Sequence, residues 1–326
     1  MFVGMDVHRN RTQVCVMDNK GNEVRNRNVV NDRRLLATEL SGLKRGTPVA
    51  FEAAYGTGWV AQLLSELGLE AHLAHPSGCR AIADAKLKYD RVDARTLVNL
   101  LRTGYLAEAW LAPQEIREQR LLLRERAWLV SLRTAAKNRV RAQLADEGIR
   151  PPEHGLWTKA GDEWLQSVEL SPMHGWAVED AMVLVTVLDS RIARLESEIR
   201  KQAKPDKRAE ALMAIPGIGL LSAMTLVSEI GDISRFPTAR KLCAWAGLTP
   251  SMRNSDRTVH HGHITKAGPR SVRHVLGEAA HVACHHEPYA SDFAATKRRR
   301  GTGIALVRIS RKLLTESFHV LRALEA

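Results

Sequence analysis

The chain of 326 residues carries a formal net charge of +12 and has a sequence pI of about 9.9, which favours a polyanionic partner, either nucleic acid or an acidic membrane surface. No apolar run approaches the ~18 residues of a membrane-spanning helix, and the first residues, MFVGMDVHRNR, lack the pattern of an export signal. The cysteines show no CxxC spacing, which is typical of free thiols in a reducing compartment. We therefore expect a cytoplasmic protein that binds DNA or RNA and no membrane.

The first part of the chain predicts an α/β sheet with one antiparallel flank. Residues 1–8 are typical of a strand, and residues 12–29 predict a hairpin with its turn at 18–22. A helix with an asparagine cap is predicted from residue 31. A strand at 47–56, a helix at 57–68, a strand at 69–76 and a helix containing residues 90–101 follow. A meander followed by alternating helices and strands is the pattern of a mixed sheet.

From about residue 114 the strand signal disappears. Residues 114–144 predict an arginine-rich helix, and a later segment repeats apolar residues at spacings of three and four, which favours a coiled coil or a helical hairpin. The remainder reads as helices joined by loops. We expect three domains, at 1–112, 113–204 and 205–326. The apolar repeat consists of Val178, Ala181, Val185, Leu188, Ile192, Leu195 and Ile199.

Four acidic residues lie in predicted strands or at the start of a predicted helix, close to apolar segments. Asp6 lies in the first strand and Glu52 in a later one, although a carboxylate has poor β propensity and is costly to bury. Asp90 and Asp93 are one turn apart and share a helix face. If the two strands are neighbours, the four carboxylates converge and need a cation among them. Mg²⁺ suits oxygen ligands, and two such ions would stabilise the attacking and leaving oxygens of a phosphoryl transfer.

Simpler explanations exist for each acid. Asp90 can cap the helix with Asp93 as its companion in the first turn, because acidic groups satisfy free N–H groups there. Asp6 alone can be a residue at a strand end. The order of the four acids nevertheless resembles the ribonuclease H-like, RuvC-like nuclease fold, in which the first strand, a later strand and a following helix supply the carboxylates.

Residues 212–230 contain Pro216-Gly217-Ile218-Gly219 between two apolar helical segments, which resembles a helix–hairpin–helix. Gly217 and Gly219 would let the backbone approach a phosphate, and the N–H groups of the next helix would point at it. Such a contact grips the nucleic-acid backbone without reading bases. The alternative is a tight turn between core helices.

A basic block follows, and it contains Ser255. A serine hydroxyl is a weak nucleophile unless a base or an electrostatic field activates it, and flanking cations can stabilise charge on an attacked phosphate. A second basic stretch, residues 297–312, and the arginines of the 114–141 helix also suit a nucleic-acid backbone. The predicted basic contacts are Arg253, Arg257, Lys266, Arg270, Arg273, Arg298, Arg299 and Arg300.

Several motifs together resemble the DEDD transposases of the bacterial insertion-sequence family whose recombinases are guided by a bridge RNA. They are GMDVHRN, FEAAYGTG, KYDRVDARTL, AIPGIG and KLCAWAGLTPSMRNS…ITKAGPRSVRHVL, and they span most of residues 1–280. The resemblance implies that Asp6, Glu52, Asp90 and Asp93 form the metal site and that Ser255 becomes joined to DNA. It also implies donor and target DNA, a guide RNA and a homo-oligomer, dimer or tetramer, as partners.

We therefore expect an Mg²⁺-dependent DNA recombinase that works through a phosphoserine–DNA intermediate. It would have an RNase H-like N-terminal domain, a coiled-coil insert and a mainly helical C-terminal domain. One alternative is a metal-dependent nuclease or junction resolvase in which water attacks and Ser255 is ordinary. The other is a non-catalytic nucleic-acid-binding protein.

Overall fold

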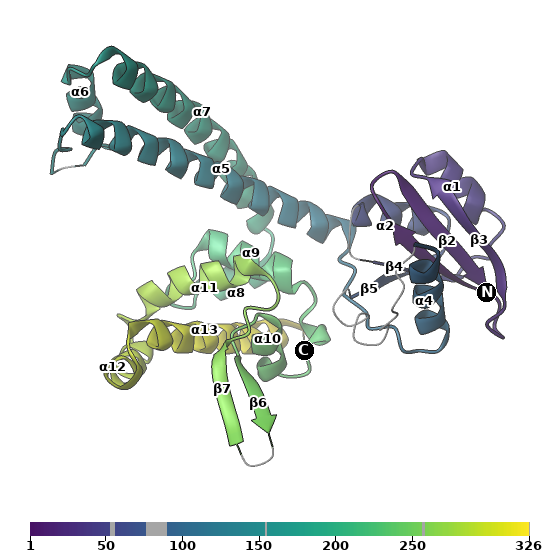
Figure 1. Ribbon diagram of the computed structural model, residues 1–326. Helices are drawn as coiled ribbons and strands as arrows, with labels where there is room; N and C mark the ends of the chain where they lie inside the picture. The colour runs from purple at the N-terminus through teal and green to yellow at the C-terminus, as the bar shows by residue number, and fades with distance from the viewer. Residues whose placement is uncertain (53–55, 76–89, 154, 256–257, 326) are drawn as a thin grey trace. The chain divides into compact units, whose positions relative to one another are not determined.

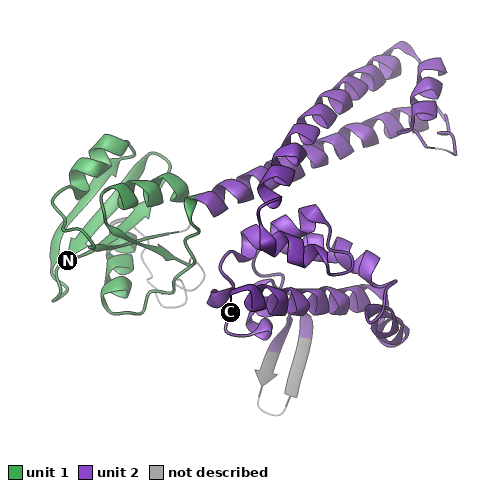
Figure 2. Ribbon diagram, turned by 180° about the vertical axis from the view of Figure 1, so that it is seen from behind, with its two compact units in different colours: residues 1–114 green, residues 115–326 purple. Residues whose placement is uncertain are grey.

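The computed structural model describes residues 1–52, 56–75, 90–153, 155–255 and 258–325, with side chains for all of these except residues 90, 91, 253–255 and 258–261. The chain forms two compact units, residues 1–114 and residues 115–326 (Figure 2). The helical arm and the C-terminal helices both belong to the second unit, so their separation at 204–205 stays a prediction. No helix within the described ranges combines the length and apolarity of a membrane span.

A five-stranded sheet organises the first unit, with the strand order β3-β2-β1-β4-β5. The strands are β1 (Phe2–Val7), β2 (Arg11–Met17), β3 (Glu23–Val30), β4 (Pro48–Glu52) and β5 (Glu70–Ala74). β1, β2 and β3 pair antiparallel, whereas β1, β4 and β5 pair in parallel. The predicted mixed sheet with one antiparallel flank is confirmed, and so is the neighbourhood of the two strands that carry Asp6 and Glu52.

Helices cover both faces of this sheet (Figure 1). Val3, Met5, Val49 and Phe51 project to one face and form a core with α1 (Arg33–Leu40) and α2 (Thr57–Glu66). Residues of opposite parity, such as Cys15 and Ala50, project to the other face, where α4 (Asp90–Arg102) packs. Because side chains alternate along a strand, Asp6 and Glu52 belong to the α4 face.

The cap of α1 differs from the prediction by one residue. Asp32, and not Asn31, has the extended backbone of an N-cap, and its carboxylate accepts hydrogen bonds from the N–H groups of Arg34 and Leu35. The carboxamide of Asn31 instead donates to the backbone oxygen of His8. Both side chains can cap a helix, so the sequence pattern alone did not separate them.

The second unit begins with an arm made of two long antiparallel helices, α5 (Gln114–Asp146) and α7 (Pro172–Ala203), joined through α6 (Lys159–Ser167) (Figure 1). Arg126 and Arg133 of α5 form ion pairs of 2.7 and 2.5 Å with Glu196 and Asp189 of α7. The pairing of two helices of one chain is a helical hairpin, one of the two predicted forms. The buried members of the apolar repeat are Val178, Ala181, Val185, Ile192 and Ile199, while Leu188 and Leu195 are half-buried.

A helical core completes the second unit. α13 (Thr302–Glu325) lies at its centre and buries Ile309, Leu313 and Phe318 among the surrounding helices. The surrounding helices are α8 (Lys207–Met213), α9 (Leu220–Ile230), α10 (Ala239–Trp245), α11 (Arg270–Ala283) and α12 (Tyr289–Arg300), with a short 3-10 turn at Ile233–Arg235.

The expectation of helices joined only by loops is wrong for residues 250–264. This segment forms a two-stranded antiparallel ribbon of β6 (Pro250–Ser255) and β7 (Thr258–Ile264). Its strands are rich in serine, arginine, asparagine and histidine and lack alternating apolar residues. The usual strand signal is a buried apolar face, and a ribbon without such a face does not produce it.

Candidate active site

Asp6 occupies the carboxyl-terminal half of β1 and is only 7% exposed. Its Oδ2 lies 3.0 Å from Nε2 of His8, whose side chain is 53% exposed. Directly opposite on β2 is Gln13. A nearly buried carboxylate needs polar neighbours to offset the loss of hydration, and His8 supplies one of them. The sequence reading did not single out His8, although its spacing of two from Asp6 places both on the same strand side.

Glu52 lies beside Asp6 in the sheet. The parallel register of β1 and β4 pairs Gly4 with Ala50 and Met5 with Phe51, and the next positions along the two strands are Asp6 and Glu52. Glu52 is half-buried and is the last residue of β4. Carboxyl ends of parallel strands meet at one edge of a sheet, which is where ligand sites of open α/β sheets form.

The contact between β1 and α4 depends on Gly4. A Cβ at this residue would lie 2.2 Å from the backbone oxygen of Ala94 and 2.7 Å from the backbone nitrogen of Val98. The helix backbone therefore rests directly on the strand, two residues before Asp6. A glycine inside a strand often marks such a close approach, and this signal was available in the sequence.

The direction of α4 places its first turn at the carboxyl end of β1. Its last residue, Arg102, lies against Gly21 in the β2–β3 turn, because a Cβ on Gly21 would be 3.0 Å from Nη2 of Arg102. That turn adjoins the start of β1, since Phe2 pairs with Met17. The helix thus runs opposite to β1, and its amino-terminal end approaches the end of the strand that carries Asp6.

Asp93 is in the first turn of α4 and is half-buried. Leu97 and Leu100 follow it at spacings of four and seven, and both belong to the buried apolar cluster that contains Ala50 of β4. Residues at these spacings share one helix face, so Asp93 lies on the stripe that faces the strand ending in Glu52. Three of the four predicted acids therefore come to the same end of the same sheet face.

The fourth acid, Asp90, begins α4, but its side chain lies outside the described residues. Among the side chains that are described, no group of three or more histidine, cysteine, aspartate or glutamate residues is arranged to hold a metal ion. Asp6, Glu52 and Asp93 share an edge of the sheet without forming a closed set of ligands there.

Ser255 ends strand β6, where it pairs with Thr258 across the ribbon. It is therefore at the far end of the ribbon from Pro250 and Ile264, which pair at the other end. The side chains of Ser255 and Arg253 lie outside the described residues, as does the whole of Arg257. The backbone thus presents the predicted nucleophile at a ribbon tip.

The foot of the ribbon is tightly braced. Nη1 of Arg273 lies 2.6 to 3.3 Å from the backbone oxygens of Ala246, Ala267, Gly268 and Pro269, which share its two N–H groups. Gly268 has φ +70°, and a Cβ there would meet the backbone oxygen of Trp245 at 1.9 Å. Arg273 was predicted as a nucleic-acid contact, and the structure gives its half-buried guanidinium a bracing function.

The glycine turn joins α8 to α9 beside α11. Gly217 has φ +84°, and a Cβ on it would lie 2.3 Å from the backbone oxygen of Ala279. Gly219 is exposed, caps α9 with φ −84° and has open space around its missing Cβ. The two glycines therefore differ: Gly217 allows close packing of two backbones, while Gly219 leaves the start of α9 accessible.

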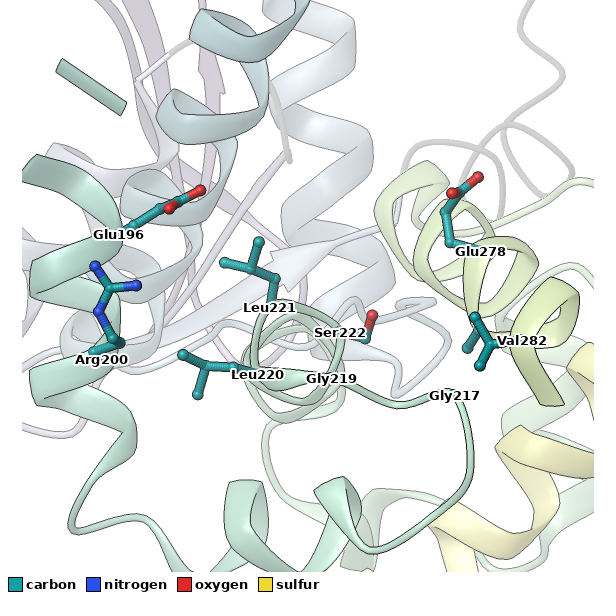
Figure 3. Close-up of a pocket in the computed structure, with 10 residues that line it drawn as sticks. Glu196, Arg200, Gly217, Gly219, Leu220, Leu221, Ser222, Glu278 and Val282 are labelled. Atoms are coloured by element: carbon teal, nitrogen blue, oxygen red, sulfur yellow. The ribbon is translucent and has the colours of Figure 1, made fainter. Parts of the chain in front are cut away.

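A cavity of about 490 Å³ opens at this start of α9 (Figure 3). Gly219 and Ser222 lie on one side of it, Glu278 and Val282 of α11 on another, and Glu196 and Arg200 of α7 on a third. Its charged side chains include two acids and one base, so they do not favour an anion. A phosphate contact at Gly219 would depend on the backbone N–H groups of α9.

Curated relatives match most of the length of the chain. A "Probable family 20 transposase" of Pseudomonas aeruginosa is 29% identical over 291 residues, which are 86% of this chain and 84% of the relative. The "Transposase for insertion sequence element IS1111A" of Coxiella burnetii is 25% identical over 322 residues, 95% of this chain and 86% of the relative. The "Transposase for insertion sequence element IS1328" of Yersinia enterocolitica is 25% identical over 89% of this chain and 86% of its own.

Two family descriptions match as well. The DEDD transposase of the IS110 type, described as "Transposase", matches residues 3–148, and "Transposase IS116/IS110/IS902 family" matches residues 209–295. Together they take in more than two thirds of the sequence. The chain belongs to the IS110/IS116 family of transposases. The first match includes the four acids, and the second includes Ser255.

The transposase is thus an enzyme that cleaves and transfers DNA strands, which sets aside the non-catalytic alternative. Its DEDD domain implies a general dependence on divalent metal ions. The residues fit this requirement, because Asp6, Glu52 and Asp93 offer only carboxylate oxygens, the donors that hard divalent cations prefer.

Several basic residues of the transposase form ion pairs within the second unit, although the side chain of Arg124 is still 61% exposed. On α5, Arg120 and Arg124 contact the buried Glu229 of α9, and Arg126 and Arg133 bind α7. This assigns four of the arginines of the 114–141 helix to internal contacts. The predicted contacts that are exposed are Lys266, Arg270, Arg298, Arg299 and Arg300.

Proposed function

We propose that this transposase exchanges DNA strands through a covalent bond between Ser255 and DNA, at a site completed by divalent metal ions on Asp6, Glu52, Asp90 and Asp93. The observation that carries the metal site is the register of β1 and β4 together with the direction of α4, which brings three of these acids to one end of one sheet face. Two observations support Ser255. It lies at the tip of the β6–β7 ribbon, and it falls within the residues that match the IS116/IS110/IS902 transposase family.

The proposed reaction balances without a nucleotide cofactor. Oγ of Ser255 forms a bond to the phosphorus and loses its proton, while the bond from phosphorus to the 3′-oxygen breaks and that oxygen gains a proton. The 3′-hydroxyl of a second cut strand then loses its proton and forms a bond to the phosphorus, while the bond from phosphorus to Oγ breaks and Oγ regains a proton. The phosphodiester energy is retained in the covalent intermediate. We propose Mg²⁺, two ions at each site, as the bound metal, which would neutralise charge on the phosphate.

The proposed partners are donor DNA, target DNA and a guide RNA that selects them. Base pairing with an RNA can supply sequence choice while the protein grips only backbones. The exposed residues suited to that grip are Gly219, Lys266, Arg270 and the basic end of α12. Lys297, Arg298, Arg299 and Arg300 are consecutive and all exposed there, which gives a concentrated positive surface.

The proposed homo-oligomer is supported by a second apolar stripe on α7. Met173, Trp176, Val183, Leu184 and Val187 are 49% to 68% exposed, and they lie on a different face from the buried repeat. Exposed large apolar residues at helical spacing suit a helix of another copy.

The decisive experiment compares Ser255→Ala with Ser251→Ala in the full chain. Ser251 is in the same strand, and its hydroxyl donates to the backbone oxygen of His263. Each protein is incubated with Mg²⁺, flanking RNA of the element and labelled target DNA, and the products are separated under denaturing conditions. We expect a covalent protein–DNA adduct with Ser251→Ala and none with Ser255→Ala.

The same assay separates the remaining alternative. A nuclease in which water attacks would cleave DNA at near-normal rates after Ser255→Ala and would form no adduct in any variant. Strand exchange by Ser255→Ala at a rate within a few-fold of the parent would overturn the serine mechanism.

A further inference from the structure

A row of polar side chains continues from Asp6 across the antiparallel half of the sheet. Gln13 is opposite Asp6 on β2, and Asn28 is opposite Gln13 on β3. Arg11 and Asn26 lie two positions from these residues on the same face, because side chains alternate along each strand. We call Arg11, Gln13, Asn26 and Asn28 the amide strip.

The members of the amide strip are held in place by one another. Nε2 of Gln13 donates to Oδ1 of Asn26 at 2.6 Å, and Nδ2 of Asn28 donates to Oε1 of Gln13 at 3.0 Å. Arg11 donates to the side chain of Asn28 and, at 3.2 Å, to its backbone oxygen. Each carboxamide has two N–H donors, and the bond from Gln13 and the bond from Asn28 each use one of them.

This composition is unusual for a sheet. Asparagine is depleted in strands, where β-branched and aromatic residues are favoured. On the same face, Cys15 and Met17 are apolar where Ala94 and Val98 of α4 pack on them. The polar row begins where β2 passes Asp6. Gln13 is 6% exposed, while Arg11 and Asn28 are exposed, so the outer part of the strip faces solvent beside the acids.

We propose that the amide strip binds the sugar–phosphate backbone of the DNA strand that enters the acid site. This inference rests on the proposed function of Asp6. From Asp6 to Asn28 there are two strand spacings, about 10 Å, which corresponds to about three nucleotides at a rise of 3.4 Å. Amide and guanidinium groups donate to phosphate and sugar oxygens. Val30, opposite Arg11, is the exposed apolar neighbour of the strip on this face, and a surface in which polar donors predominate suits a nucleic-acid backbone better than a protein partner.

The chain offers a matched control for this surface. Arg27 is next to Asn28 on β3, but alternation directs it to the opposite face, where it lies 3.6 Å from Glu39 with its side chain 69% exposed. Arg11→Ala and Arg27→Ala remove the same charge from the same sheet. A purely electrostatic effect of net charge would therefore be equal in the two variants.

The experiment measures binding of a fluorescent duplex bearing the element end by the full-length Arg11→Ala, Arg27→Ala and Asn28→Ala proteins over a range of salt concentrations. In parallel, a photo-crosslinking phenylalanine derivative replaces Asn28 or Arg27 in a Ser255→Ala background, and each protein is irradiated with the duplex and the flanking RNA of the element. We expect Arg11→Ala to weaken binding about three- to tenfold and to lower the salt slope by about 1, while Arg27→Ala changes neither. Crosslinks to DNA should form from position 28 and not from position 27.

Equal weakening by Arg11→Ala and Arg27→Ala, equal crosslinking from the two positions, or a crosslink to RNA alone would overturn the proposal. None of these readouts needs strand cleavage, so they remain valid if the serine mechanism fails. Conversely, a covalent DNA adduct on Ser255 without any crosslink from position 28 would refute the proposed DNA binding by the amide strip and leave the serine mechanism intact. Thermal unfolding of each variant identifies any loss of binding that comes from misfolding.

Discussion

The backbone oxygen of Ala94 lies 2.2 Å from the point that a Cβ on Gly4 would occupy. This contact seats α4 on β1, and the residue before Ala94 is the acid Asp93. The Gly4→Ala change should push the helix away from the strand and move Asp93 relative to Asp6. We expect DNA cleavage to fall at least ~100-fold, because displacement of catalytic groups by about 1 Å has effects of this size.

The control for this change is Gly42→Ala, because a Cβ at Gly42 meets no atom within 4 Å. It should leave cleavage unchanged. Unfolding by urea should show that Gly4→Ala also loses about 1–3 kcal/mol of stability, as expected for overpacking. Normal cleavage by Gly4→Ala would contradict the dependence of the acid site on this contact.

The two glycines of the α8–α9 turn should respond differently to substitution. Gly217→Ala places a Cβ 2.3 Å from the backbone oxygen of Ala279 at φ +84°, so we expect it to lose about 2 kcal/mol or more of stability. Gly219→Ala meets open space and should cost about 0.5 kcal/mol as a poorer cap. Calorimetry measures both values, and equal losses would refute the distinction.

The carboxylate of Glu229 is a buried link between the arm and the helical core. It lies 3.0 Å from Nη2 of Arg124 and accepts a hydrogen bond of 2.9 Å from Ser271 of α11. Burial lowers the pKa of the Arg120 guanidinium, and the charge of Glu229 opposes that effect. Removing the charge by Glu229→Gln leaves the buried cation uncompensated, and we expect a loss of about 3 kcal/mol in the free energy of unfolding.

Glu278→Gln is the matched control for Glu229→Gln, since Glu278 is an exposed glutamate of the same unit. Its effect should stay within about 0.5 kcal/mol. Urea denaturation followed by circular dichroism gives both numbers. A similar small change in the two variants would show that the contacts of Glu229 carry little stability.

Asp206 predicts a pH dependence of stability. Burial raises its pKa, but hydrogen bonds and the charge of Arg208 outweigh burial and leave the pKa below the ordinary value. A carboxyl whose pKa is lowered by folding stabilises the native state above its unfolded pKa, about 3.9, and loses that contribution as the pH falls through the native pKa. The stability advantage over Asp206→Asn should be up to about 1 kcal/mol at pH 7 and should decline as the pH falls below about 3.9 and through the lowered native pKa.

This comparison uses asparagine because it also caps helices, and Asp206 caps α8 by accepting from the N–H of Arg208. The measurement is thermal unfolding of both proteins between about pH 2 and pH 7. A difference that is independent of pH would show that the charge of Asp206 is not the stabilising feature.

The exposed stripe of α7 should control assembly. Leu184→Glu and Val187→Glu place charges among side chains that are 55% and 49% exposed in the single chain, so folding should be retained. Burying those charges between two copies would be costly, and we expect at least a tenfold weaker association by light scattering. Ala193→Glu, exposed on another face of α7, should associate like the parent protein.

The acid site was the part of the molecule that sequence reasoning reached most directly. The mixed sheet follows from alternating strands and amphipathic helices, and a carboxylate inside a strand conflicts with strand propensity, so Asp6 and Glu52 were visible. The strands that carry Asp6 and Glu52 are neighbours because of the strand order of the sheet, and the order of predicted strands and helices in the sequence favoured that topology. Whether the side chain of Asp90 joins them stays a prediction, since it lies outside the described residues.

Contacts that depend on packing could not be read in the same way. From the sequence alone, Arg273 and the arginines of α5 were predicted to contact nucleic acid. The sequence does not distinguish an arginine that binds a backbone carbonyl from one that binds a phosphate. Only the positions of Glu229 and of the loop carbonyls distinguish them. The ribbon of β6 and β7 was missed because its polar strands carry no apolar period.

Fixing the base of the β6–β7 ribbon limits how the transposase can move during a reaction. Arg273 of α11 contacts the backbone at Ala246, before the ribbon, and at Ala267, Gly268 and Pro269, after it, and so holds the two chain segments that lead into and out of the ribbon. A swivel at that joint is therefore disfavoured. In the proposed reaction, a DNA end attached to Ser255 would therefore move together with the helices around the base of the ribbon. The orientation of those helices would then determine the direction from which the DNA end approaches a new strand.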